Sequence, residues 1–231
     1  MNLSRFELAA WDCSTIGQQL RVDALAELSG EFSGDVLDLG CGKKPYERLL
    51  GRGVRRWVGL DFHTTYSGRS SADVFGNALD VPFKSCSFDT VLCTEVLEHV
   101  PRPDQVFREV TRILKPGGTL ILTVPQTNPL HEEPHDYYRV TCYGLRFLAG
   151  QAGLDVVLTA PLGGAIATIG QMIVWHSNFL RRLPLIGPAI ARPTTVALGW
   201  AFLKLDRLSA FYGGGAMKDT LGWLLFARKP R

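Results

Sequence analysis

Short apolar runs alternate with helix-like segments over the first two thirds of the chain. Apolar runs closed by glycine, aspartate or proline predict buried strands over residues 36–39, 57–60, 72–75, 88–93, 119–124, 154–158 and 221–227. Apolar positions at helical spacing predict helices over residues 4–29 and 106–114, a helix that begins at Pro45, and a helix that carries Leu145 and Leu148. This alternation predicts an α/β fold, a doubly wound and mostly parallel sheet with helices on both faces.

The segment from residue 160 to residue 218 breaks this alternation. It is apolar, rich in glycine and proline, and sparsely basic. We therefore predict four parts, listed in chain order: an N-terminal helical segment, 1–33; an α/β core, 34–159; a hydrophobic basic insertion, 160–218; and a final core strand with a basic tail, 219–231.

Composition excludes global disorder, and charge separates the two ends of the chain. The 231 residues are 46% hydrophobic and 20% charged, which is enough apolar material for a full core. The net charge of +3 combines −4 over residues 1–155 with +7 over residues 156–231. Such asymmetry indicates an anionic partner for the C-terminal region, either a membrane surface or a nucleic acid.

The cysteines and the N-terminus indicate a reducing compartment. The five cysteines form no C-x-x-C pair, and the first eight residues carry acidic and basic side chains without an apolar run. We therefore expect a cytoplasmic protein without a disulfide framework.

Glycines that follow the first predicted strand indicate a ligand site. Gly40 and Gly42 let the backbone approach a ligand closely, at the sheet edge where open α/β folds bind ligands. A dinucleotide fingerprint would have a third glycine at position 45, where Pro45 stands, which counts against a hydride-transfer enzyme. Asp61 lies 19 residues after Gly42, where an acid suits a ribose diol.

Several motifs in order resemble class I S-adenosylmethionine-dependent methyltransferases, specifically the methyltransferase type 11 group. The matching stretches are VLDLGCGKKPY (36–46), GLD (59–61), VPF (81–83), SFD (87–89), EVLEHV (95–100), RILKPGG (112–118) and VP (124–125). The resemblance implies a Rossmann-like seven-stranded sheet whose last strand is antiparallel, with S-adenosylmethionine as the cofactor and S-adenosylhomocysteine as its product.

The resemblance also implies roles for individual residues. Gly40 and Gly42 would line the methionine end of the cofactor, above the negative charge of Asp38, and Asp61 would hold the ribose hydroxyls. Asn77 stands where the family often has aspartate for the adenine amine. The remaining cofactor contacts that we expect are Tyr46, Phe62, Ala78, Thr94 and Glu95. Glu98 and His99 belong to the signature as well, either as a structural network or as substrate contacts.

Candidate groups for the acceptor cluster after the fifth predicted strand. His131, His135 and Tyr137 are the catalytic candidates, because imidazole is a suitable base near neutral pH for a hydroxyl acceptor. Asp136 and Arg139 could instead form an ion pair that orders this loop. No helical register of the two histidines is evident, so we predict no metal.

The insertion has three interpretations: a docking segment for an anionic membrane surface, a helical cap over the acceptor, or a homodimer interface. Pro184, Pro188, Arg192 and Pro193 argue against a transmembrane span. Trp175 and Trp200 suit an interfacial position, and Arg181, Arg182, Arg192, Lys204 and Arg207 suit anionic headgroups. The apolar character without a dense basic stripe argues against nucleic acid.

These observations lead to one functional hypothesis and two alternatives. We expect O-methylation of a hydroxyl or carboxyl on a hydrophobic or lipid-linked acceptor, including one from a glycan pathway, by a peripheral protein of the inner membrane face. The alternatives are a soluble methyltransferase for an aromatic or glycosyl metabolite and a scaffold that binds the cofactor without turnover.

Overall fold

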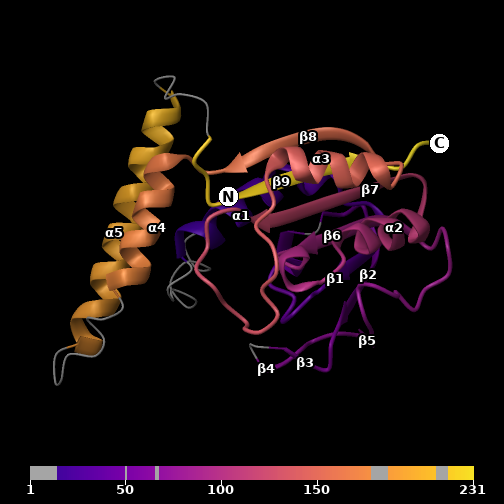
Figure 1. Ribbon diagram of the computed structural model, residues 1–231, viewed down its shortest axis with the longest axis horizontal. Coiled ribbons are helices and arrows are strands. Elements are labelled where there is room, and N and C mark those ends of the chain that lie inside the picture. The colour runs from indigo at the N-terminus through magenta and orange to yellow at the C-terminus, as the bar shows by residue number, and fades with distance from the viewer. Residues whose placement is uncertain (1–14, 50, 66–67, 178–186, 212–217) are drawn as a thin grey trace. The chain divides into compact units, whose positions relative to one another are not determined.

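The computed structural model describes residues 15–49, 51–65, 68–177, 187–211 and 218–231 of the chain (Figure 1). The chain forms two compact units, each of them assembled from separate stretches of sequence. Unit 1 comprises residues 1–23 and 161–221, and unit 2 comprises residues 24–160 and 222–231. Residues 4–14 of the predicted first helix lie outside the described residues, and the described part is α1 (Thr15–Glu27).

Unit 2 is built on a seven-stranded sheet in the order β5-β2-β1-β6-β7-β9-β8. The strands are β1 (Gly34–Leu39), β2 (Val54–Asp61), β5 (Val74–Phe75), β6 (Phe88–Thr94), β7 (Leu114–Pro125), β8 (Asp155–Leu162) and β9 (Gly222–Arg228). Strands β5, β2, β1, β6 and β7 are parallel, and β9 is antiparallel to β7. A separate antiparallel pair joins β3 (Thr64–Thr65) to β4 (Gly68–Arg69). The predicted fold class is therefore confirmed.

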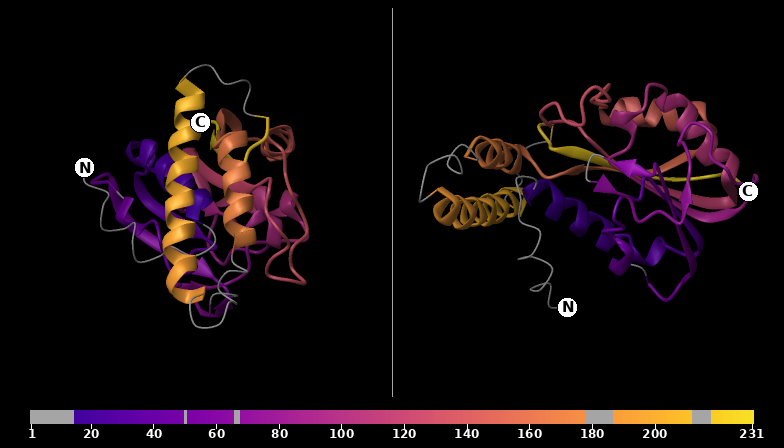
Figure 2. Two further views of the ribbon diagram at one scale, coloured as in Figure 1. Left: turned by 90° about the vertical axis from the view of Figure 1, so that its left-hand side faces the viewer. Right: turned by 90° about the horizontal axis from the view of Figure 1, so that it is seen from below.

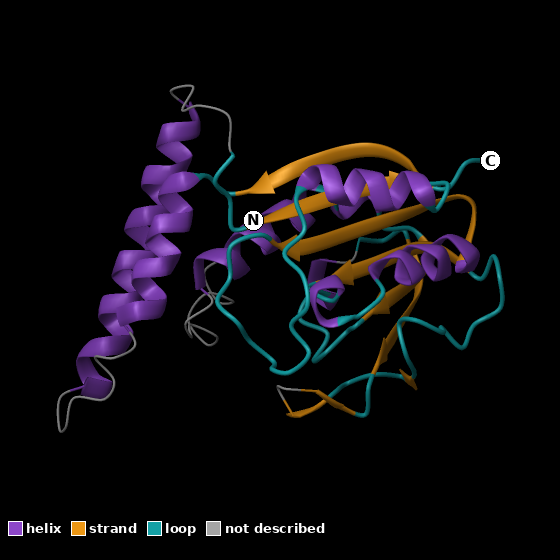
Figure 3. Cartoon of the chain, viewed as in Figure 1, coloured by secondary structure: helices purple, strands orange, loops and turns teal. Residues whose placement is uncertain are grey.

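Two amphipathic helices lie side by side on one face of this sheet (Figure 3). In α2 (Pro103–Ile113), Pro103 occupies the first turn, where its missing N–H costs no hydrogen bond, and the apolar stripe is buried. In α3 (Cys142–Gln151), the Thr141 hydroxyl caps the first turn by accepting the Gly144 N–H at 3.2 Å, and Leu145 is buried. Both helices confirm the sequence prediction.

Three local predictions were wrong. The helix expected from Pro45 is a turn followed by the short 3₁₀ helix η2 (Glu47–Leu49), because Gly42 and Lys44 both have positive φ and reverse the chain. Leu114, expected at the end of a helix, is the first residue of β7. The strand expected from residue 72 is reduced to two residues, β5. Two further 3₁₀ turns are η1 (Ser29–Glu31) and η3 (Leu97–His99).

Unit 1 contains two helices that lie side by side, α4 (Ala165–Ser177) and α5 (Gly187–Phe211) (Figure 2). They occupy the segment between β8 and β9, where the insertion was predicted. Helix α5 runs through Pro188 and Pro193. Both lie within its first two turns, and a proline is tolerated in the first turn. Among the described helices, none is long and apolar enough to cross a membrane. Arg181 and Arg182 lie outside the described residues.

Candidate active site

The carboxyl ends of β1, β2, β6 and β7 meet at one edge of the sheet, because these strands are parallel. After β1 the chain turns through Gly40 (φ +77°) and Gly42 (φ +51°), a conformation that disfavours other residues. A Cβ on Gly40 would collide with the Val96 side chain, whereas a Cβ on Gly42 would meet open space. Gly42 therefore leaves its backbone accessible at the position where a cofactor was predicted.

Asp38 lies directly below this turn, near the end of β1, and its carboxyl group is fully buried (1% exposed). Its Oδ2 atom accepts no hydrogen bond from any residue in the described part of the chain. Burial raises the pKa of Asp38 to about 8, and the Asp61 carboxylate adds to the rise while Lys44 opposes it. An ionised carboxyl buried without a donor is costly, so a cationic ligand bound beside Asp38 would stabilise its charged form.

Asp61 ends β2 and fixes the geometry of the glycine turn. Its Oδ2 accepts the Gly42 N–H at 2.7 Å, and its Oδ1 accepts the Phe62 N–H at 2.7 Å. Each carboxylate oxygen has two lone pairs, so both can accept a further hydrogen bond, for example from a diol. Phe62 follows with its ring 58% exposed, which makes an apolar face available beside Asp61.

The other predicted cofactor residues differ in how exposed their side chains are. Asn77 is exposed, but its Oδ1 already accepts the Leu79 N–H at 2.9 Å, and Ala78 and Tyr46 are buried. Thr94 ends β6 and is buried. Glu95 has a positive φ of 53°, and its Oε1 accepts the Thr123 hydroxyl at 3.0 Å. Glu95 is therefore held in a strained conformation at the sheet edge.

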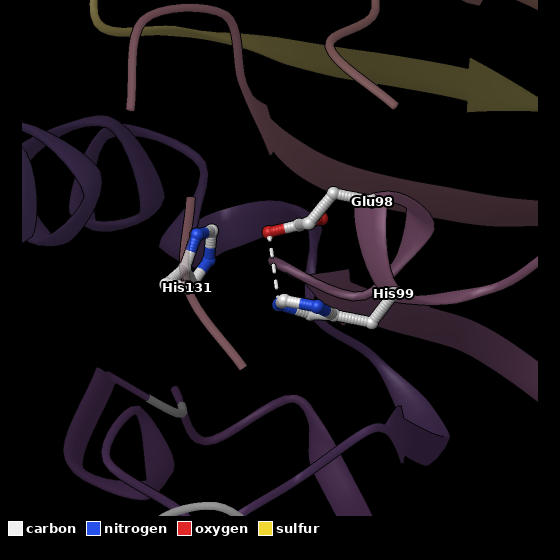
Figure 4. A group of neighbouring side chains, drawn as sticks. All are labelled: Glu98, His99 and His131. Atoms are coloured by element: carbon white, nitrogen blue, oxygen red, sulfur yellow. Dashed lines mark ion pairs between the residues drawn. The ribbon is translucent and has the colours of Figure 1, made fainter. Parts of the chain in front are cut away.

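A group of three side chains, Glu98, His99 and His131, joins the end of β6 to the loop after β7 (Figure 4). Glu98 is completely buried, and its Oε1 lies 3.7 Å from the Nε2 atom of His99. The two imidazole rings stack edge to face, with centroids 4.8 Å apart. The Nδ1 atom of His99 lies 2.7 Å from the His135 carbonyl oxygen, and a carbonyl can only accept, so Nδ1 carries the proton. The Nε2 atom of His99 is therefore the basic atom.

Glu98, His99 and His131 also have the donor types of a metal site. Their ligand atoms lie within 4.8 Å of one another. The expectation that the site holds no metal stays a prediction.

The remaining catalytic candidates form a second pair in the loop of residues 126–141, which runs from β7 to α3 (Figure 3). The Nδ1 atom of His135 lies 3.0 Å from the Tyr137 hydroxyl, and both side chains are exposed. The predicted ion pair of this loop is confirmed, since two Arg139 nitrogens contact the Asp136 carboxylate at 2.5 and 2.8 Å. The guanidinium lowers the pKa of Asp136 to about 2.

Arg139 and Asp136 together hold the loop that carries His131. Arg139 also donates to the Asn128 and Pro129 carbonyl oxygens at 3.2 and 3.1 Å. Asp136 accepts the His131 N–H at 3.0 Å, and its Oδ2 lies 3.4 Å from the His131 Nδ1 atom. These contacts fix where the His131 ring lies relative to His99.

Sequence reasoning placed His131, His135 and Tyr137 in one cluster and left His99 undecided. The structure instead pairs His131 with His99, which is 32 positions earlier in the chain. The signal available in the sequence was topological. Both residues follow the carboxyl ends of β6 and β7, which are neighbouring parallel strands.

Comparisons with known proteins agree with this geometry. Residues 37–122 match the sequence profile of a family described as a methyltransferase domain. One curated relative, a ubiquinone biosynthesis O-methyltransferase of Pseudomonas aeruginosa, is 29% identical over 121 residues, which are 48% of this chain and 52% of the relative. The chain thus spans about half the length of the curated relatives it matches.

Two solved structures resemble the fold over most of this chain. A phosphoethanolamine N-methyltransferase 2 of Haemonchus contortus, crystallised with S-adenosyl-L-methionine, has a TM-score of 0.56 at 16% identity and covers 100% of this chain and 61% of its own. A [4+2]-cyclase has a TM-score of 0.56 at 20% identity and covers 90% of this chain and 81% of its own. Because such folds serve more than one reaction, these two likenesses show the fold alone. The profile match goes further than the fold: over residues 37–122 the chain is similar to a family of methyltransferase domains.

Proposed function

We propose that this chain is an S-adenosylmethionine-dependent methyltransferase that methylates an oxygen, a hydroxyl or a carboxyl, on a hydrophobic or lipid-linked acceptor. The observation that carries the proposal is the buried Asp38 carboxyl, whose Oδ2 accepts no hydrogen bond from the described residues. The sulfonium and ammonium of the cofactor are cations that would compensate this carboxyl.

The residues around Asp38 fit the rest of such a cofactor. Gly40 and Gly42 would let the backbone lie against its methionine end, and Asp61 would accept the ribose hydroxyls with its remaining lone pairs. Phe62 offers an exposed ring to the adenine. Asn77 would have to exchange its contact with the Leu79 N–H, or share that oxygen, to meet the adenine amine.

The bound cofactor supplies an electrophilic methyl group and a sulfur leaving group, so the protein has to position the acceptor oxygen and, where that oxygen belongs to a hydroxyl, to take its proton. His99 suits the second task. Its Nε2 atom carries the lone pair and lies 3.7 Å from the Glu98 carboxylate and 3.9 Å from that of Glu132.

His131, His135 and Tyr137 would act around that base. The edge-to-face contact between the rings lets His131 fix the orientation of His99, with Asp136 holding its backbone. His135 holds the Nδ1 proton of His99 through its carbonyl oxygen and meets the Tyr137 hydroxyl with its ring. His135 and Tyr137 are exposed, so they are available to contact the acceptor.

The choice of acceptor rests on the relative and on the character of unit 1. The curated relative is an O-methyltransferase, which supports oxygen as the atom that is methylated. The apolar, acid-free stretch of residues 156–205 supports a hydrophobic acceptor that is presented at an anionic membrane surface. A soluble metabolite, a turnover-free scaffold and a homodimer are the competing outcomes.

The test is methyl transfer from S-adenosylmethionine to a long-chain alkyl catechol and to a water-soluble catechol, with cofactor binding measured separately by calorimetry. We expect His99→Gln to keep cofactor binding and to lose methyl transfer at least 10²-fold. His176→Gln, an exposed histidine of α4, is the matched control and should keep full activity.

Each result decides one part of the proposal. Full activity in His99→Gln would refute this base, and equal turnover of both catechols would point to a soluble acceptor. Cofactor binding without methyl transfer to any oxygen acceptor would favour the scaffold, and a lack of cofactor binding would overturn the whole proposal.

A further inference from the structure

The α4–α5 hairpin of unit 1 carries an apolar stripe on each helix that no described side chain covers. On α4, Ile169, Met172 and Ile173 are 53%, 42% and 41% exposed. On α5, Leu205 and Leu208 are each 51% exposed. Positions three and four residues apart, 169 with 172 and 173, and 205 with 208, place each stripe along one side of its helix. Exposed alanines extend the stripes at positions 165, 197 and 201.

The opposite side of both helices packs inside unit 1. Ala167 and Val174 of α4 and Leu203 of α5 are buried in one cluster with Ile16 and Leu221. The stripe positions lie about half a helical turn away from these buried positions. Because both helices meet the same cluster with their inner sides, both stripes face outward on the same side of the hairpin.

Polar contacts hold the inner side in place. The Gln171 Oε1 atom accepts the N–H groups of Ile16 and Gly17 at 2.9 and 3.1 Å, at the start of α1. The buried Asp206 carboxylate accepts the Gly164 N–H at 3.0 Å at the start of α4. These contacts satisfy helix ends that would otherwise lack partners. The hairpin is thus already fastened on one side, and its outer side remains unused among the described residues.

The charges around the stripes select an anionic partner. Residues 156–205 contain no aspartate or glutamate. Lys204 is exposed next to Leu205, whereas Arg207 is engaged with Asp23 at 2.6 Å. In a symmetric dimer the same patch meets itself, so the Lys204 side chains of the two copies would approach each other, while the adjacent Asp206 is buried in its contacts with the start of α4. Anionic headgroups would pair with Lys204 while the stripes enter the apolar boundary.

We propose that the outer side of the α4–α5 hairpin, formed by the two stripes and Lys204, docks in the plane of an anionic phospholipid bilayer. At about 1.5 Å per residue, α4 is only about 20 Å long, which suits a helix that lies on the membrane rather than one that crosses it. The proposal deepens the proposed function, because a lipid-linked acceptor is presented at such a surface.

The experiment is flotation of the full chain with vesicles of phosphatidylglycerol and phosphatidylcholine, and with vesicles of phosphatidylcholine alone. The stripe variant combines Ile173→Glu with Leu208→Glu. The matched control combines Tyr143→Glu with Phe147→Glu, which adds the same charge at exposed apolar positions of α3. Lys204→Ser tests the charge separately. Binding of S-adenosylhomocysteine by each variant confirms that unit 2 is folded.

We expect the unaltered chain and the control to float with anionic vesicles, more at low salt than at high salt. The stripe variant should lose about tenfold or more of this binding, because it removes two half-exposed side chains from the apolar boundary. Lys204→Ser should weaken binding about fivefold and reduce its salt dependence. Vesicle binding and cofactor binding are separate measurements, so failure of the docking proposal leaves the proposed methyl transfer intact.

Three results would overturn the proposal. The first is an unaltered chain that stays in solution with every vesicle. The second is a stripe variant that floats as well as the control. The third is a stripe variant whose only change is from dimer to monomer in sedimentation, which would assign the stripes to a second copy.

Discussion

The buried Asp38 carboxyl makes a sharp prediction about how stability depends on pH. Its pKa of about 8 in the folded chain compares with an ordinary value of 3.8. Between these values the folded chain holds a proton that the unfolded chain has released. Stability therefore falls as the pH rises, by about 1.4 kcal/mol per pH unit from this group. Over two units, from about pH 5 to about pH 7, the loss is about 3 kcal/mol.

Asp38→Asn removes this contribution, because an amide does not titrate in this range. We expect the free energy of unfolding of the variant, minus that of the unaltered chain, to grow by about 3 kcal/mol between about pH 5 and about pH 7. Urea unfolding of the cofactor-free chain at both pH values measures it. The difference cancels every other titrating group that the two proteins share. A difference that stays the same at both pH values would refute the assignment of an uncharged, buried Asp38.

The number of protons released when the cofactor binds is a second test of the Asp38 carboxyl. A cation beside Asp38 lowers its pKa, so binding at about pH 7 should release close to one proton. Calorimetry in two buffers with different ionisation enthalpies counts that proton. Asp38→Asn should release none and should bind S-adenosylmethionine at least about tenfold more weakly. Equal proton release from both proteins would separate the cofactor from Asp38.

Three further changes have defined outcomes. Gly40→Ala should destabilise the chain by more than about 2 kcal/mol in urea unfolding, since its φ is positive and the new Cβ would collide with Val96. Asp136→Asn should cost about 2 kcal/mol at neutral pH, because Arg139 lowers the folded pKa to about 2. This contribution is present above about pH 4 and is lost as the pH falls towards 2. Asp206→Ala should lower the helicity and melting temperature of the chain, at a cost of about 1 to 2 kcal/mol.

Each of these changes has a matched comparison. Gly42 also has a positive φ, but a Cβ at this position would meet open space. Gly42→Ala should therefore cost less stability than Gly40→Ala, and an equal loss of stability would refute the collision. The difference in the free energy of unfolding between Asp136→Asn and the unaltered chain should shrink as the pH falls. A difference that persists at about pH 2 would contradict the ion pair. Asp219→Ala, an exposed acid of unit 1, should leave the melting temperature unchanged beside Asp206→Ala.

The sequence was most informative where local pattern and tertiary structure agree. Apolar runs closed by turn residues identified β1, β2, β6, β7 and β9, because strands whose central residues are buried have few polar positions there. The glycine turn and Asp61 followed from strand ends alone. The helix predicted from Pro45 was wrong. Lys44, the residue before it, has a positive φ and forms a 2.6 Å ion pair with Asp73, a contact outside the segment that no local pattern shows.

The acceptor side was harder to predict, since its side chains come from separate loops. His99 meets His131 only after β6 and β7 pair, and no local pattern encodes that contact. The exposed stripes of α4 and α5 could not be predicted from the sequence either. The hydropathy of that segment is high on all sides, and only packing against Ile16 distinguishes the buried side from the exposed one.

The polar contacts of unit 1 also determine when that unit is able to form during synthesis. The first turn of α1 depends on Gln171, which is made 155 residues after Ile16, and the first turn of α4 depends on Asp206. A ribosome releases residues 24–160 in between. The N-terminal part of α1 must therefore wait, with Ile16 uncovered, while most strands of unit 2 emerge. Nascent chains shorter than about the first 171 residues expose an apolar N-terminal segment that a chaperone would recognise.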